Sequence, residues 1–159
     1  KETAGYIIIP ELENGDILPD LSSGAKDQIR GFLTSGGNLL MFRPYSGDLI
    51  DFLNDLFGYS IAGAGEGAPI SLTMAGAELF PDESPTIPDN DATRSLDTST
   101  LPSEAITIYE GGGTNQSVVT LIPYGSGKIY VFGWDWFGAV PLGGQDGGWL
   151  HLLHSVLES

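Results

Sequence analysis

Cysteine is absent from all 159 residues, and this absence excludes several kinds of chemistry. The chain can form no disulfide, and it offers neither a thiolate nucleophile nor a cysteine ligand for a metal ion. A chain of this length can still bury one sizeable core without cross-links. We therefore expect a single α/β domain over residues 1–159.

Basic residues are scarce, with six Lys and Arg against 21 Asp and Glu and a formal net charge of −15. The phosphates of DNA and RNA and the headgroups of anionic lipids would repel such a chain, so we expect no nucleic-acid partner. Cations would be attracted, and calcium is the cation that prefers carboxylate oxygens. Solvation accounts for most of the acidic residues, and a few remain candidates for holding a cation.

Long apolar runs are missing, and so are a signal peptide and a lipidation motif. We therefore expect no direct insertion into a membrane. The first residue is Lys1 rather than Met, from which we expect that the sequence is part of a longer chain.

Motifs of nucleophilic and phosphate chemistry are also absent. The sequence has no Gly-x-Ser-x-Gly elbow, and Gly111, Gly112 and Gly113 lack the Lys-Ser/Thr that completes a phosphate loop. The two histidines, His151 and His154, lie three residues apart without a His-Glu-x-x-His pattern, so we interpret them as ordinary helix positions. These absences predict a protein that is not an enzyme.

Apolar patterning predicts strands that alternate with helices. A buried strand over Tyr6–Ile9 ends at Pro10, a helix capped by Ser22 or Ser23 ends at a Gly-Gly pair, and a second buried strand covers Asn38–Phe42. A second helix is predicted from Ser46 to residue 57. A strand–helix–strand unit implies parallel pairing of its two strands.

The second half of the chain has a different pattern. Residues 60–104 are rich in Gly, Ala, Ser, Asp and Pro, and apart from a strand at 70–73 they predict a long irregular insertion. A strand at 105–109, a hairpin of 117–123 with 128–132, and a helix over Trp149–Leu157 capped by Asp146 complete the pattern. The predicted fold is a flavodoxin-like three-layer sandwich, with a partly parallel sheet and an antiparallel C-terminal hairpin.

Two stretches carry a family resemblance, namely SGGNLL at 35–40 and YGSGKIYVFGWD at 124–135. With the strand before Pro10, they resemble the class I glutamine amidotransferase-like fold, especially its trehalose-utilisation-protein-like branch. The amidotransferases of that superfamily use a Cys nucleophile with His and Glu partners. Because this chain has no cysteine, the resemblance implies the fold without that activity. The family also has a first strand and helix that this sequence lacks before residue 6. We expect either that they lie upstream in a longer parent chain or that the sheet is smaller here.

A third stretch, residues 133–149, resembles ligand-binding modules within large calcium-dependent adhesins that marine bacteria secrete. The resemblance implies a module of an exported protein that binds a peptide or a saccharide on a cell surface, with calcium as a cofactor. The expected localisation is secreted or on the bacterial cell surface.

Candidate ligand-binding residues come from the rule that ligands lie beyond the carboxyl ends of parallel strands. Together with the third stretch, the rule selects Arg43, Tyr45, Trp134, Asp135, Trp136, Gln145 and Asp146. Several alternatives stay open. Arg43 could pair with a ligand carboxylate or with a nearby acid. Asp135 could instead cap backbone amides between packed Trp side chains, and Trp134 and Trp136 could form a stacking surface or belong to the core.

Candidate calcium ligands are acidic residues that are closely spaced in predicted loops: Glu11, Glu13, Asp89, Asp91 and Asp97. No EF-hand pattern is present, and a solvated acidic loop is the alternative for each residue. The sequence thus favours a non-catalytic ligand-binding module of a bacterial adhesin. Two other functions remain, a carbohydrate-active hydrolase that uses paired carboxylates and a structural spacer domain.

Overall fold

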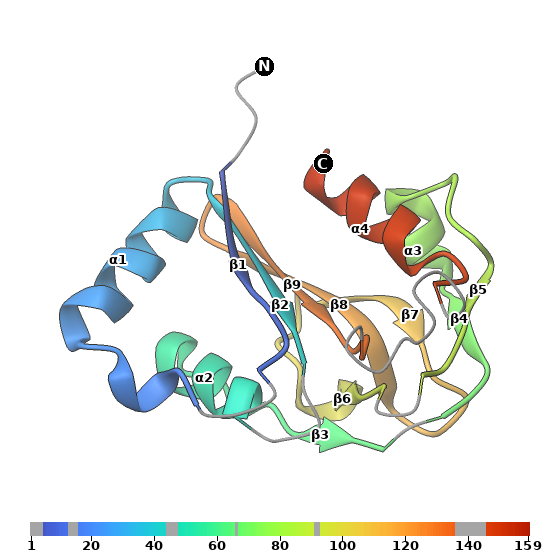
Figure 1. The fold of residues 1–159 in the computed structure, drawn as a ribbon, viewed down its shortest axis with the longest axis horizontal. Helices are drawn as coiled ribbons and strands as arrows, with labels where there is room; N and C mark the ends of the chain where they lie inside the picture. Colours follow the sequence, from blue (N-terminus) through green and yellow to red (C-terminus); the bar gives the residue numbers. More distant parts are fainter. Residues whose placement is uncertain (1–4, 13–15, 44–47, 66, 91–92, 136–145) are drawn as a thin grey trace.

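The computed structural model describes residues 5–12, 16–43, 48–65, 67–90, 93–135 and 146–159. These residues form one sheet of nine strands with helices packed on it (Figure 1). The strands are β1 (Tyr6–Ile9), β2 (Asn38–Phe42), β3 (Gly63–Ala64), β4 (Ile70–Leu72), β5 (Thr86–Ile87), β6 (Ser95–Asp97), β7 (Ile106–Glu110), β8 (Gln116–Tyr124) and β9 (Gly127–Phe132). The helices are α1 (Ser23–Thr34), α2 (Asp48–Phe57), α3 (Met74–Leu79) and α4 (Trp149–Leu157), with short 3-10 helices at Leu18–Asp20 and Thr98–Thr100.

The sheet has a parallel part and an antiparallel part, and β9 joins them. The strand order is β1-β2-β9-β8-β7-β4-β5, with β6 beside β8 and β3 beside β6. The strands β1, β2 and β9 run parallel, whereas β9 and β8 form an antiparallel hairpin. In the turn of this hairpin Gly125 has a φ of 60°, a backbone conformation that favours glycine. The predicted parallel unit and C-terminal hairpin are confirmed.

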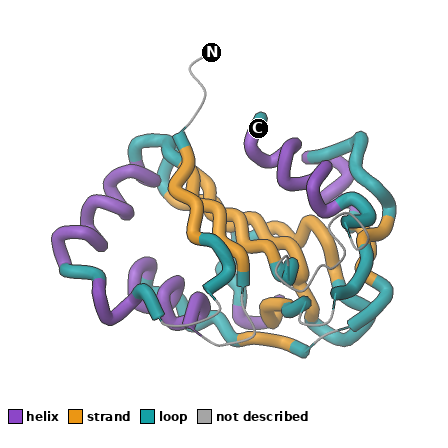
Figure 2. Tube along the Cα trace, viewed as in Figure 1, coloured by secondary structure: helices purple, strands orange, loops and turns teal. Residues whose placement is uncertain are grey.

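Helices cover both faces of the sheet, so the molecule has three layers (Figures 1 and 2). Successive residues of a strand point to opposite faces. Leu39 and Met41 pack with apolar side chains of α1 and α2, whereas Leu40 and Phe42 pack with those of α4. All five residues of β2 are therefore buried, which explains why this strand is a continuous apolar run in the sequence. The predicted three-layer sandwich is confirmed.

The segment 60–104 is more regular than the sequence predicts. It contains α3 and the short strands β3, β4, β5 and β6, which pair along the antiparallel part of the sheet. Ile70 of β4 pairs with Ile87 of β5, and both side chains are buried. Strands of two or three residues are too short to show an alternating pattern, so tertiary pairing decides their conformation.

The described helices are short, and their first residues follow capping chemistry in part. Ser22 caps α1 as predicted, because its side chain accepts a hydrogen bond from the N–H of Ala25. The predicted N-cap of α4 is wrong by two residues: Gly148 holds that position, while the Asp146 carboxylate accepts from the N–H of Leu150 at 2.7 Å. No helix in the described ranges has the length and apolar character needed to cross a bilayer.

Candidate functional site

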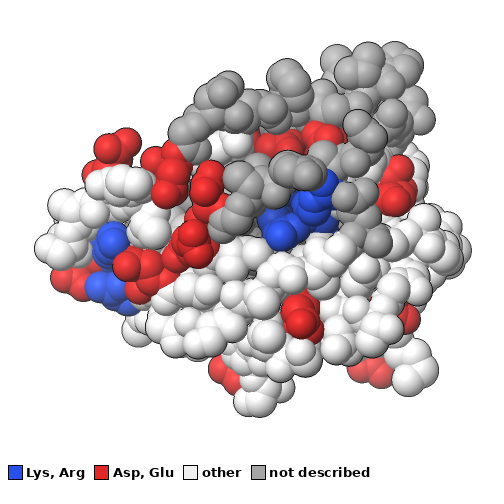
Figure 3. All heavy atoms as spheres, turned by 90° about the horizontal axis from the view of Figure 1, so that it is seen from below, with Lys and Arg blue, Asp and Glu red and all other residues white. Residues whose placement is uncertain are grey.

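The neighbouring parallel strands β2 and β9 send the chain to opposite faces of the sheet. After β2 the chain continues to α2, which packs with α1, and after β9 it leads to α4 on the other face. Open α/β sheets bind ligands at such a point, beyond the carboxyl ends of the two strands. We call the residues that follow the two strands, Arg43 and 133–135, the switch edge. Figure 3 views the molecule from below, onto this end of the sheet.

Arg43 follows directly after β2, and its guanidinium lies inside the protein. The backbone N–H of Arg43 donates to the carbonyl of Phe132 at 2.7 Å, which ties the two strand ends together. The residue is 6% exposed, and its Nε and Nη1 atoms are buried with no hydrogen-bond partner among the described residues. Burial, and secondly the positive charge of Arg94, lower the pKa of Arg43 to about 10. The guanidinium therefore remains charged at neutral pH.

The absence of a side chain at Gly63 leaves room for the guanidinium of Arg43. A Cβ atom at Gly63 of β3 would lie 2.5 Å from Nη2 of Arg43 and 3.2 Å from Cδ1 of Ile50. Real Cβ atoms do not approach another heavy atom to 2.5 Å, so a larger residue at position 63 would displace the guanidinium. Nη2 of Arg43 therefore lies directly against the backbone of Gly63.

Asn90 and Arg94 both contact the switch edge. The backbone N–H of Arg94 donates to the carbonyl of Gly133 at 2.9 Å, and the side-chain amide of Asn90 donates to the carbonyl of Asp135 at 2.9 Å. Asn90 is buried, and its Oδ1 has no partner among the described residues. Sequence reasoning missed Asn90 and Arg94, because an acidic loop gave no sign that it returns to the ends of β2 and β9.

Trp134 and Asp135, two of the sequence-predicted ligand residues, are both buried. The ring of Trp134 stacks on that of Trp149, with centroids 5.6 Å apart and planes 3° apart. Trp134 therefore belongs to the core, one of the two alternatives that the sequence left open, and is not an exposed stacking surface. Its Nε1 is buried and has no hydrogen-bond partner in the described part of the chain. Asp135 reaches the same end of the sheet as Arg43, as the strand-end rule predicts.

The other predicted ligand residues do not extend this group. Tyr45, Trp136 and Gln145 lie outside the described residues. Asp146 is described, and its carboxylate binds the first turn of α4 at the N–H of Leu150. Of the sequence-predicted ligand residues, Arg43, Trp134 and Asp135 therefore belong to the switch edge, and Asn90 and Arg94 contact it.

Three of the predicted calcium ligands, Glu11, Asp89 and Asp97, are described by the structure. Asp97 accepts hydrogen bonds from the N–H and hydroxyl of Ser99 at 2.9 and 2.7 Å, and these bonds lower its pKa. Burial raises the pKa of Asp89, which lines a cavity of about 590 Å³ together with Pro69 and Ile87. Glu11 is partly buried after β1, and Glu13 and Asp91 lie outside the described residues. Within the described ranges no three acidic or histidine side chains gather as metal ligands, and calcium binding stays a prediction.

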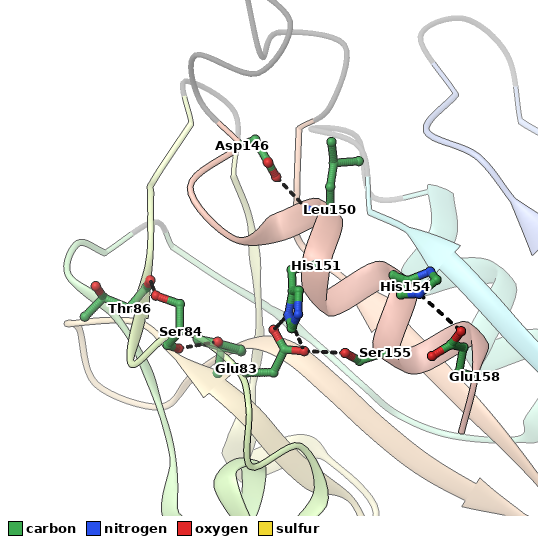
Figure 4. A network of polar contacts seen from close by, with 10 residues as sticks. Glu83, Ser84, Thr86, Asp146, Leu150, His151, His154, Ser155 and Glu158 are labelled. Carbon is green, nitrogen blue, oxygen red and sulfur yellow. Dashed lines mark hydrogen bonds and ion pairs between the residues drawn. The ribbon is translucent and has the colours of Figure 1, made fainter.

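A second polar cluster joins α4 to the segment after α3 (Figure 4). Nδ1 of His151 lies 3.0 Å from both carboxylate oxygens of Glu83, and the hydroxyl of Ser155 donates to the same carboxylate. The Glu83 side chain is 1% exposed, whereas that of His151 is 58% exposed. Because Ser155 donates to Glu83 rather than to His151, the cluster does not have the hydroxyl–imidazole bond of a catalytic triad.

Comparison with known proteins gives a fold but no family. No family model matches the chain, and no curated protein matches it. A solved cytoplasmic protein from Salmonella typhimurium is 16% identical, with 96% of this chain and 70% of that chain covered and a TM-score of 0.58. A second cytoplasmic protein, from Salmonella typhimurium LT2, is 16% identical over 97% of this chain and 72% of that chain, with a TM-score of 0.61.

A larger enzyme also contains this fold. The β-galactosidase from Bacillus circulans sp. alkalophilus is 15% identical, with a TM-score of 0.52, and the match covers 96% of this chain but 22% of the enzyme. At such identities these similarities show a shared α/β fold alone.

Proposed function

We propose that this chain is a non-catalytic ligand-binding domain that holds a peptide or a saccharide at the switch edge. The observation that carries the proposal is the buried guanidinium of Arg43, whose Nε and Nη1 have no partner among the described residues, at the point where β2 and β9 send the chain to opposite faces. Buried polar atoms are nearly always hydrogen-bonded, so such atoms at a strand end indicate a place for a ligand.

Asn90 supports the same location. Its amide nitrogen fixes the carbonyl of Asp135, while its Oδ1 remains as a buried acceptor. The donors of Arg43 and the acceptor of Asn90 would offer both kinds of hydrogen bond to a polar ligand. Specific binding needs a few such groups on a rigid support, which the ends of two paired strands supply.

The proposed setting is a large exported bacterial adhesin, in which this domain binds its ligand on a cell surface and calcium orders acidic loops. The adhesin-like residues 133–149 and the net charge of −15 support this setting. The absence of cysteine supports a non-catalytic role for a fold that resembles that of glutamine amidotransferases.

The proposal is tested by screening the whole 159-residue chain on glycan and peptide arrays, and then by mapping hits through backbone amide NMR shifts. We expect a hit that shifts the amides of Arg43, Arg94 and Asp135. Binding to no ligand on either array would support a spacer domain instead. Shifts confined to other parts of the sheet would contradict the switch edge.

The same ligands provide a test for catalysis. If the chain releases product from any of a panel of glycosides, and Asp135→Asn abolishes that release, the function is hydrolysis by paired carboxylates and not ligand binding alone. Our proposal expects no release above the rate in buffer.

A further inference from the structure

The basic side chains of the described residues differ in their pairing with acidic side chains. Lys26 pairs with Asp55 at 2.6 Å, and Arg30 pairs with Asp27, and in both pairs the acidic partner is exposed. Arg43 is buried, and the Nε and Nη1 atoms of its guanidinium have no hydrogen-bond partner among the described residues. In a sequence with 21 acidic residues, this is an unusual arrangement. A buried charge normally has an oppositely charged partner, so the guanidinium of Arg43 is suited to bind an anionic group of a ligand.

A second positive charge lies close to the first. Arg94 is near enough to lower the pKa of Arg43 by repulsion, and its backbone is fixed to Gly133. In Figure 3, acidic side chains are spread over the face seen from below, and blue basic atoms gather near its middle. Two positive charges, those of Arg43 and Arg94, thus lie close together at an end of the sheet that also holds Asp135, and the repulsion between the two bases is reduced when an anionic group binds beside Arg43.

The space around the guanidinium is limited on the side of β3. The glycine at position 63 leaves room for Nη2, and Ile50 of α2 packs beside it. A guanidinium that is already in place loses little freedom when it binds, and its planar set of N–H donors matches the two oxygens of a carboxylate.

We infer that the ligand carries a carboxylate, which accepts hydrogen bonds from the Nε and Nη1 donors of Arg43. This inference rests on the proposed function, because it names the chemistry of the ligand that the switch edge binds. The acidic side chain of Asp135, buried at the same edge, disfavours a doubly charged phosphate, whereas a singly charged carboxylate brings one charge to one guanidinium. The neighbouring acceptor of Asn90 suits a hydroxyl or an amide N–H on the same ligand.

Isothermal titration with matched probes tests the inference on the whole chain. Glucuronic acid is compared with glucose, and N-acetyl-alanyl-alanine with a free C-terminus is compared with its C-terminal amide. Inorganic phosphate serves as the dianion. We expect the carboxylate member of one pair to bind at least about tenfold more tightly than its neutral partner and than phosphate, since one charge-assisted hydrogen bond accounts for that ratio. The pair that responds distinguishes an acidic saccharide from a peptide C-terminus.

Variants then assign the effect to Arg43. Arg43→Met should weaken binding of the carboxylate probe at least about tenfold. Arg43→Lys keeps the charge but loses the planar donors, so its affinity should lie between those of the parent and of Arg43→Met. Lys128→Met removes a charge at the opposite end of β9 and should change affinity less than about twofold, because that charge is screened over the distance. Circular dichroism confirms that each variant is folded.

Two outcomes would overturn the inference. Neutral probes that bind as tightly as their acids would show that no carboxylate is recognised, and an Arg43→Met variant that binds like the parent would show that Arg43 does not recognise it. The proposed function would survive either result if array hits still shift the amides of the switch edge. It would fail separately if no ligand binds at all.

Discussion

Nδ1 of His151 in α4 lies 3.0 Å from Oε1 of Glu83, and this hydrogen bond connects an exposed imidazole to a buried carboxylate. This contact raises the pKa of His151, through the hydrogen bond to Glu83 first and then through its charge and that of Asp82. Ser155 donates to the same carboxylate from one turn further along the helix. The pair therefore makes the docking of α4 sensitive to pH.

The sign of this sensitivity follows from linkage. A raised pKa means that the folded state favours protonated His151, so the contribution is fully present below the ordinary value of 6.5 and is lost as the pH rises through the folded-state pKa. We expect His151→Gln to lower the unfolding midpoint at pH 6 and to change it much less at pH 9. Thermal unfolding monitored by circular dichroism measures the difference. His154→Gln is the control, because His154 pairs with the exposed Glu158, and an equal effect of both variants at both pH values would refute the prediction.

Replacing the buried guanidinium should stabilise the protein. Arg43→Met keeps most of the volume and removes a buried charge that has no partner among the described residues, so we expect a gain of about 1–2 kcal/mol in the free energy of unfolding. Urea unfolding provides the measurement, and Lys128→Met, at the other end of β9, should stay within about 0.5 kcal/mol of the parent. A loss of stability in Arg43→Met would mean that the guanidinium supports the fold rather than a ligand.

Much of the fold could be predicted because its main elements carry local signals. Ser22 predicts the start of α1, and the apolar run of β2 and the glycines of the β8–β9 turn predict their places. The two-residue strands β3 and β5 carry no such signal, since they exist only through their partners. The strand-end rule led to Arg43 and Asp135, but the return of Asn90 to Asp135 depends on the path of a long segment that periodicity does not describe.

Gly133 should be intolerant of any side chain. A Cβ there would lie 1.8 Å from the carbonyl oxygen of Arg94 and 2.9 Å from that of Val118, both of which are backbone atoms that cannot turn aside. We expect Gly133→Ala to cost at least about 2 kcal/mol or to prevent folding. Gly31→Ala is the matched control: nothing lies within 4 Å of its Cβ, and inside α1 the change should stabilise by roughly 0.5–1 kcal/mol. Equal tolerance of the two substitutions would contradict this packing.

Calcium provides a separate prediction. If the cation orders the acidic segment near Asp89, millimolar calcium should raise the unfolding free energy by about 1–3 kcal/mol, and magnesium should do less. Asp89→Asn should reduce the rise, whereas Asp97→Asn should leave it unchanged, because the Asp97 carboxylate already binds Ser99. Differential scanning calorimetry with and without a chelator measures the effect. An identical midpoint in both would remove calcium from the proposed function.

The place of β9 between two kinds of strand has a consequence for synthesis. The N–H of Lys128 donates to the side chain of Asn38, ninety positions earlier, and Leu40 pairs with Tyr130. A ribosome therefore releases β1, α1 and β2 long before the strand that completes their layer has been made. Until β9 is synthesised, the apolar side chains of β2 lack the strand that they pack beside. We therefore expect misfolding or chaperone binding of the nascent chain to be most frequent during that interval.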